Sequence, residues 1–337
     1  MLALFAVLLA DPLSVYFIDV EGGGAMLVVS PGGESMLVDS GYPDLGDRDL
    51  NRILRVARDV AKLDRIDAAV VTHWHLDHYG NHAGLAANIP VGTFYDRGIP
   101  DALQEDKDFP DRIAKYRAAS NNASKTLRVG DAFELAGSDT EPPVTVEVLA
   151  ASRDVAEGGE PNPYAEEHEP RDRDASDNAE SLAMRITCGE FRLFCGGDLT
   201  WNVEAELVTP NNPIGPVDVY MVTHHGLSTS NNPVLVKAVD PTVAVMCNGP
   251  SKGGHPDVLA TLRERQQNGS LEAWFQLHEN LSVPPESQAN AARIANRSDT
   301  ASCEGRFIRV LHTPGSGEFA VNVEGRHGET FAVRESD

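Results

Sequence analysis

The stretch IDAAVVTHWHLDH, residues 66–78, decides the fold of this chain. It begins as an apolar segment typical of a buried strand and runs directly into His73, His75, Asp77 and His78. Residues two apart lie on the same side of an extended segment, so His73 and His75 can reach one ion. Asp77 and His78 follow as the chain turns and can reach a second ion nearby. Imidazole and carboxylate suit zinc, and also manganese or iron.

A second stretch with the same plan, VDVYMVTHHG, occupies residues 217–226. Both stretches have an aspartate, an apolar strand, a threonine and then a histidine. This repetition predicts two related β/α halves. Because open α/β architectures place ligands at the carboxyl ends of strands, we expect the two strand ends to meet at one site.

The remaining pattern predicts an α/β chain. We expect three short antiparallel strands within 15–38, helices at 49–63, 81–87, 100–119, 201–207, 232–239 and 256–267, strands at 91–95, 132–135, 144–149 and 242–246, a hairpin across 181–195, and two or three small strands after 307. Residues 152–177 are polar and acidic, which predicts a long loop or flap.

Composition limits the class of protein. The chain has 337 residues, long enough for one large α/β domain or two smaller ones. Its formal net charge is -23, so its surface repels polyanions at long range and an extended nucleic-acid-binding face is excluded. A bound metal or a local basic pocket is still able to hold one phosphate group.

The first ten residues, MLALFAVLLA, form an apolar leader that resembles the core of a secretory signal without its positive flank. This favours an exported protein, periplasmic or extracellular, over a cytoplasmic one. No later segment is expected to span a membrane. The four cysteines are expected to be buried or partly buried thiols.

Other candidate residues lie in the second half. Asp198 follows two glycines in FCGGDLT, and the glycines allow close approach of the backbone. The parallel with His73 favours His224 over His225 as a metal ligand. His225 is then a candidate catalytic residue that contacts substrate or supports a ligand. His255 is a further catalytic candidate, and Lys252 is expected to be a solvated loop lysine.

The H-x-H-x-D-H string after an apolar strand resembles the signature of the metallo-β-lactamase superfamily. The resemblance covers roughly residues 13–260 and implies a four-layer αββα sandwich. It also implies that Asp39 in LVDSG is a structural carboxylate, that Asp198 bridges two metals and that His224 is the last ligand. We therefore expect a hydrolase domain at 13–265 and a C-terminal extension of small strands packed on it at 266–337.

One departure from the family pattern is informative. Most members of the superfamily carry another histidine between the string and the bridging aspartate, and here Asn178 stands near that place. Together with Gly-His-Pro at 254–256, this resembles the branch that contains the hydrolase domain of the competence protein ComEC. The first site would then have His73, His75 and Asp198. The second would have Asp77, His78, Asp198 and His224.

The resemblance implies a zinc-dependent hydrolase, with one or two ions, in which a metal-bound hydroxide attacks an ester. Asp77 serves as ligand and proton acceptor. Within the resembled branch we expect phosphodiesterase activity on a small-molecule or single-stranded substrate. Three alternatives remain. One is a lactone or β-lactam hydrolase using the same site, and another is a degenerate, non-enzymatic metal-binding or interaction protein. The third, a redox di-iron protein, is disfavoured because no flavodoxin-like domain follows.

Overall fold

The computed structural model describes residues 11–43 and 45–334. The apolar leader at 1–10, and the expectation of export that rests on it, lie outside the described residues. Within the described ranges, no helix has both the length and the apolar character needed to cross a bilayer.

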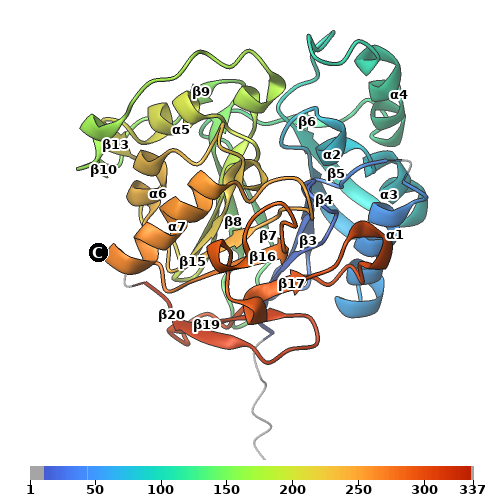
Figure 1. Ribbon diagram of the computed structural model, residues 1–337. Helices are drawn as coiled ribbons and strands as arrows, with labels where there is room; N and C mark the ends of the chain where they lie inside the picture. The colour runs from blue at the N-terminus through green and yellow to red at the C-terminus, as the bar shows by residue number, and fades with distance from the viewer. Residues whose placement is uncertain (1–10, 44, 335–337) are drawn as a thin grey trace, which may run out of the picture.

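Two large β-sheets form the centre of the molecule (Figure 1). The first sheet combines the N-terminal strands with strands from the end of the chain. Its strands in spatial order are β20 (Glu329–Ala332), β19 (Glu318–Val323), β18 (Ile308–His312), β1 (Leu13–Phe17), β2 (Met26–Val29), β3 (Ser35–Val38), β4 (Ile66–Val70), β5 (Val91–Asp96) and β6 (Lys125–Thr126).

The second sheet comes from the later part of the chain. Its strands in spatial order are β17 (Ile294–Asn296), β16 (Ala273–His278), β15 (Val243–Met246), β14 (Val219–Met221), β12 (Phe191–Cys195), β11 (Ala183–Cys188), β8 (Val144–Ala151) and β7 (Ala132–Leu135), with β9 (Asp154–Val155) paired to β8. The two-residue strands β10 (Glu160–Pro161) and β13 (Asn211–Asn212) pair separately.

The two sheets repeat one topology, as the paired sequence stretches predicted. Along β1, β2, β3, β4 and β5 the pairings are antiparallel, antiparallel, parallel and parallel. Along β8, β11, β12, β14 and β15 they follow the same order. Even the aspartates correspond: Asp67 accepts the backbone N–H of Ser35, and Asp218 accepts that of Arg192.

Helices cover the outer face of each sheet, which gives the four layers of an αββα sandwich (Figure 1). The apolar sides of the two sheets pack on each other in the main core. On the first sheet lie α1 (Arg48–Leu54), the π-helical segment η1 (Arg55–Val60), α2 (Leu76–Tyr79), α3 (His82–Asn88) and α4 (Phe109–Ala119). On the second lie α5 (Trp201–Val208), α6 (Pro233–Val239) and α7 (Pro256–Asn268). The predicted fold class is confirmed.

The structure differs from the sequence pattern in four respects. The helix expected over 100–119 forms only at 109–119, and the one expected over 49–63 changes to π-helix at Arg55. Strands β16 and β17 were not predicted at all. The segment 266–337 was expected to pack on a finished domain, but its strands are hydrogen-bonded into both sheets. All four cysteines are free thiols, and three are buried.

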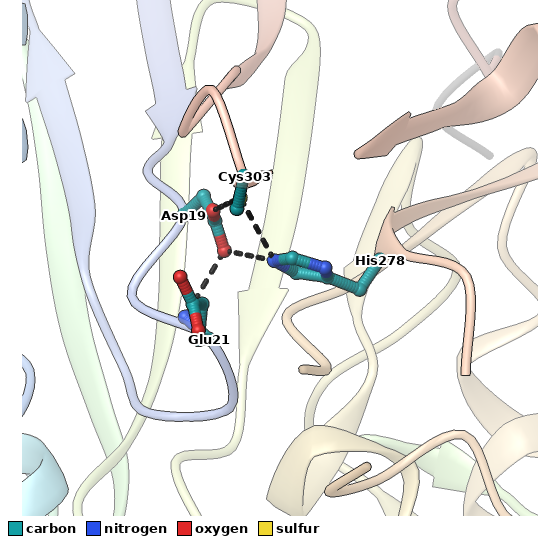
Figure 2. A group of neighbouring side chains, drawn as sticks. All are labelled: Asp19, Glu21, His278 and Cys303. Atoms are coloured by element: carbon teal, nitrogen blue, oxygen red, sulfur yellow. Dashed lines mark hydrogen bonds and ion pairs between the residues drawn. The ribbon is translucent and has the colours of Figure 1, made fainter. Parts of the chain in front are cut away.

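A buried polar cluster joins this C-terminal segment to the first half of the chain (Figure 2). Asp19 accepts from His278 Nε2 at 2.8 Å and from Cys303 Sγ at 3.2 Å. The guanidinium of Arg52 pairs with Asp19 at 2.9 Å and with Glu21 at 2.9 Å. Burial, with Asp19 beside it, raises the pKa of the Cys303 thiol to about 12, so the sulfur stays protonated. Because Arg52 pairs with both carboxylates, the cluster connects the C-terminal segment to the first half of the chain.

Removing the cation from this cluster should destabilise the fold. We expect Arg52→Met to lower the free energy of unfolding by roughly 3 kcal/mol, because the buried Asp19 loses its arginine partner and Glu21 keeps only Arg48. Urea denaturation would measure this. The matched control is Arg297→Met, which breaks a half-exposed pair with Glu279 and should cost about 1 kcal/mol or less. Equal losses in the two variants would contradict the assignment.

Candidate metal centre

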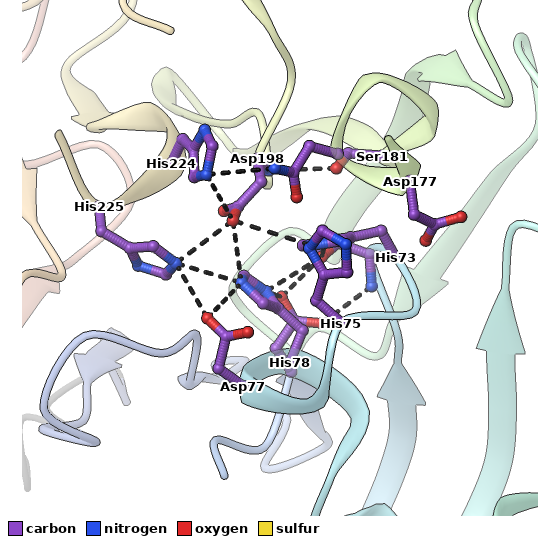
Figure 3. Close-up of polar contacts among 12 residues, drawn as sticks. His73, His75, Asp77, His78, Asp177, Ser181, Asp198, His224 and His225 are labelled. Carbon is purple, nitrogen blue, oxygen red and sulfur yellow. Dashed lines mark hydrogen bonds and ion pairs between the residues drawn. The ribbon is translucent and has the colours of Figure 1, made fainter. Parts of the chain in front are cut away.

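The H-x-H-x-D-H string lies at the carboxyl end of β4, where the chain leaves the first sheet (Figure 3). His73 follows the strand and is fully buried. His75 precedes α2, whose first turn carries Asp77 and His78, both buried. Gly24 lies against this turn, and a Cβ there would stand 2.8 Å from His78 Nδ1 and 2.9 Å from Asp39 Oδ2. The glycine therefore allows the loop after β1 to pass directly beneath the string.

The second half contributes Asp198, His224 and His225 to the same place (Figure 3). Asp198 follows β12, and its backbone N–H donates to Ser181 Oγ at 3.1 Å. The two histidines follow β14 in a tight turn, both with left-handed backbone (φ 52° and 56°). That conformation is costly for residues other than glycine. It directs two consecutive imidazoles towards Asp198 from different sides.

Four of these side chains form one compact group: Asp77, His78, Asp198 and His225. All four are buried, and one donor atom of each lies within 4.8 Å of the others. His225 Nε2 lies 3.4 Å from Asp77 Oδ2 and 3.3 Å from Asp198 Oδ2. His78 Nε2 lies 3.2 Å from both Asp198 Oδ2 and His225 Nε2. Two carboxylates and two imidazole nitrogens at such distances are suited to one divalent cation.

The rings of His78, His225 and His224 each have Nδ1 in a hydrogen bond, which leaves Nε2 facing the cluster. Ligating histidines commonly use such a bond to fix their tautomer and direction. The Nδ1 partners are Asp39 Oδ2 at 2.7 Å for His78, the carbonyl oxygen of Cys247 at 3.0 Å for His225, and Ser230 Oγ at 2.9 Å for His224. Asp39 thus lies where a structural carboxylate was expected.

A second position adjoins the compact group on the other side of Asp198. His73 Nε2 lies 3.8 Å from Asp198 Oδ2, and His224 Nε2 lies 3.5 Å from the same oxygen. His73 Nε2 is buried and has no hydrogen-bond partner among the residues that the structure describes. Buried polar atoms are rarely left without partners, so this donor set fits a cation. Asn178 Nδ2 is 3.3 Å from His224 Nε2, which brings Asn178 to the edge of this position.

His75 differs from the other histidines of the string. Its Nε2 lies 3.0 Å from Glu105 Oε1, and its ring contacts His73 edge-on at 4.7 Å between centroids. Because Glu105 occupies Nε2, Nδ1 is the nitrogen of His75 that remains for an ion. Glu105 Oε1 also accepts the backbone N–H of Asp177, whose carboxylate accepts the backbone N–H of Trp74. These contacts fix the segment from His73 to His75.

Two sequence expectations require correction. His224 was expected to complete the group around Asp77, but His225 lies there, and His224 lies on the side of His73. The cause is the left-handed turn, which the sequence parallel with His73 did not take into account. His255 was a catalytic candidate, but it is exposed at the start of α7, and only its backbone N–H bonds this turn, at Gly226 O (2.8 Å).

Lys252 was expected to be a solvated loop lysine, and it lies at the centre instead. Its Nζ forms an ion pair with Asp77 Oδ2 and lies 3.3 Å from the hydroxyl of Tyr42. The loop before α7 brings it there across 175 residues of sequence. The glycines around Lys252 are the only sequence feature that indicates a close approach of this loop to another segment. Nothing in the sequence spacing indicates that the segment is the one that carries Asp77.

The protonation states of the ligands are governed by burial and by neighbouring charges. Burial would raise the pKa of Asp198, but the neighbouring imidazoles, that of His225 first, hold its pKa well below the usual range. Burial lowers the pKa of His73 far below its ordinary value and that of His224 to about 4. An ionised carboxylate and neutral imidazoles are the forms that bind a metal ion. For His78, burial is outweighed by the adjacent carboxylates, which raise its pKa, so metal binding there releases a proton.

Two repeated β/α halves meet at a buried histidine–aspartate centre whose donor atoms suit a metal ion. Residues 19–164 match the family model described as "Metallo-beta-lactamase superfamily". This match and the αββα sandwich confirm the resemblance to that superfamily, although the matched region ends before Asp198, His224 and His225.

Solved structures similar to this chain include the metallo-beta-lactamase fold protein YhfI from Bacillus subtilis, at 16% identity and TM-score 0.44, covering 79% of this chain and 96% of that one. Another is CmlA, a diiron beta-hydroxylase from Streptomyces venezuelae, at 16% identity and TM-score 0.38, covering 70% of this chain and 44% of that one. No curated protein matches the chain.

The turn that carries His224 and His225 is anchored by a buried carboxyl group. Glu204 on α5 is fully buried, and its Oε2 accepts the backbone N–H of Asn232 at 2.8 Å. Tyr220 and Asn231 hold the other side of the turn, with 2.9 Å between the hydroxyl and Asn231 Oδ1. Burial raises the pKa of Glu204 to about 8.

This shift predicts how stability depends on pH. Because the pKa of Glu204 is raised in the folded chain, folding favours the protonated carboxyl group. The stability that this proton contributes is complete below the ordinary pKa of glutamate and is lost as pH rises through about 8. Between pH 5.5 and 8.5, the free energy of unfolding should fall by up to about 1 kcal/mol per pH unit more in the parent chain than in Glu204→Gln. Urea titrations at several pH values would test this. Glu206 is exposed on the same helix, so Glu206→Gln should leave the dependence of the unfolding free energy on pH as in the parent chain.

Metal content tests whether Asp198 and His225 are ligands. We expect Asp198→Ala to lose bound zinc at both positions and His225→Ala to lose about one equivalent per chain, because each removes a converging donor. Elemental analysis of metal-loaded, desalted protein gives the numbers, with the exposed His327→Ala as the control that retains the parent content. Full metal content in His225→Ala would refute the assignment of His225 as a ligand.

Proposed function

We propose that this chain is a zinc-dependent hydrolase that cleaves phosphodiesters, similar to the ComEC-like branch of its superfamily. One ion would be held by Asp77, His78, Asp198 and His225, and the other by His73, His75 through Nδ1, Asp198 and His224. The observation that carries this proposal is the convergence of three imidazole Nε2 atoms on Asp198 Oδ2 at 3.2–3.5 Å from two halves of the chain.

In this arrangement His224 fills the place of the histidine that the sequence lacks near Asn178. It does so from the turn after β14 and not from a separate strand. A carboxylate with two oxygens is suited to bridging two cations, and Asp198 is the group that both sets share. Manganese or iron would find acceptable ligands here too, since the donors are nitrogen and oxygen.

Bound zinc supplies a water of lowered pKa and neutralises the charge that develops on the ester. The chain's own groups orient the reaction. Asp77 Oδ2 lies between His225 Nε2 and Lys252 Nζ, so it can accept a proton at the edge of the centre. Thr72 holds Asp39 through its amide (2.8 Å) and its hydroxyl (2.7 Å), and Asp39 in turn keeps His78 in place.

Lys252 favours an anionic substrate. In a chain of net charge -23, an anion approaches only where local cations outweigh the field of the whole molecule. When Asp77 binds a metal ion, the ammonium of Lys252 is free to donate to a substrate oxygen beside it. This supports a phosphodiester over a neutral lactone. A β-lactam, which carries a carboxylate, is the second candidate.

The test is an assay of metal-loaded protein against bis-p-nitrophenyl phosphate, single-stranded DNA, an acyl lactone and nitrocefin. We expect turnover of the phosphodiesters, a loss of at least roughly 100-fold in kcat for Asp198→Ala, and a raised KM with smaller loss of kcat for Lys252→Ala. His327→Ala is the control and should keep the parent rate.

Turnover of nitrocefin alone would replace the phosphodiesterase proposal by a β-lactamase. If the turnover of all four substrates were the same with and without metal and in Asp198→Ala, the centre would not be catalytic. A non-enzymatic binding role would follow.

A further inference from the structure

A cavity of about 240 Å³ lies beside Asp77, between the loop after β3 and helices α2, α3 and α4. Its lining includes Tyr42, Leu76, Tyr79, Ala83 and Tyr116. None of the metal ligands lines this cavity. Its volume is slightly below the roughly 300–1,000 Å³ typical of small-molecule sites, so it suits one ring system and not an extended chain.

Two of the residues that line the cavity adjoin the metal centre. Leu76 is the residue before Asp77 in α2. Tyr42 has its hydroxyl 3.3 Å from Lys252 Nζ, and this ammonium pairs with Asp77. A group attached to an ester that is bound at Asp77 and Lys252 would therefore meet Tyr42 first and enter the cavity behind it.

The walls are aromatic and held in place. Tyr79 and Tyr116 both pack edge-on against the buried Trp74, at 5.5 Å and 5.1 Å between ring centroids. The hydroxyl of Tyr116 donates to Asp96 at 2.9 Å, which fixes its ring further. Such preformed walls can pack on a planar ring with little loss of side-chain freedom.

Cations border the same cavity. The side chains of Arg112 and Lys115, both on α4, contribute to its lining. Arg112 is already engaged with Asp106 at 2.8 Å, whereas the Lys115 side chain is exposed. These two cations favour an anionic ligand in a chain that is otherwise strongly acidic. The apolar walls favour a ligand that carries a ring.

We propose that this cavity is a substrate subsite for an aromatic substituent of the ester, so that the preferred substrates are aryl-substituted phosphodiesters. The proposal rests on the proposed function, because the metal centre holds the phosphoryl group. The aryl ring packs on the Tyr42 and Tyr79 side of the cavity, and Lys252 holds the phosphoryl oxygen at the junction with the centre.

The experiment compares two ligands with the same anionic group, phenylphosphonate and methylphosphonate. Isothermal titration calorimetry on the zinc-loaded full chain measures both affinities directly, without turnover. We expect phenylphosphonate to bind about tenfold more tightly, since only its ring fills the cavity. Ala83→Phe should fill the same space and abolish the difference, while methylphosphonate binding stays as in the parent.

The matched control is Ala87→Phe, the same substitution one turn further along α3 at an exposed residue outside the lining. It should keep the tenfold preference. Equal affinities of the two phosphonates for the parent chain, or a preference that survives Ala83→Phe in a variant that still binds methylphosphonate, would overturn the subsite. If neither phosphonate binds the zinc-loaded protein, the phosphodiesterase proposal fails together with the subsite.

Discussion

The structure depends on one buried carboxylate, Asp198, that is shared by imidazoles from both halves of the chain. Its Oδ2 lies 3.2 Å from His78 Nε2 and 3.3 Å from His225 Nε2. Burying such a charge is costly unless partners compensate it, and these partners come from strand ends on two different sheets. The sheets must therefore pack with their carboxyl ends aligned. The contact between the two sheets that forms the core is thus also the contact that assembles the polar centre at its edge.

The sequence was sufficient where local pattern decides the structure. Strands β4 and β14 were predicted because each is an apolar run that ends in threonine and histidine, and their common plan correctly indicated two related halves. Strand β16 was missed because Gln276 and His278 interrupt its apolar residues, so it shows neither a continuous apolar run nor alternation throughout. The strands of the C-terminal segment were recognised in part, but not their pairing with β1 and β15, because pairing between distant segments leaves no local signal.

The candidate site was predictable in kind and less so in arrangement. The four side chains of the string and Asp198 could be proposed from spacing and glycine chemistry. The positions of His224 and His225 could not, because they depend on two successive left-handed residues, a conformation that sequence pattern does not predict for histidine. Lys252, Glu105 and Asp177 reach the centre from separate loops, and only the folded backbone brings them to Asp77, His75 and Trp74.

The pairing of β1 with β18 has a consequence for how the protein is made. Leu13 lies opposite His312, so β1 leaves the ribosome about 300 residues before this neighbour is synthesised. Until then one edge of β1 is unpaired, and the loop that carries Asp19 lacks its contacts to His278 and Cys303. Contacts so distant in sequence slow folding, and unpaired strand edges favour aggregation. The nascent chain is therefore most prone to aggregation in the interval before β18 emerges and covers the open edge of β1.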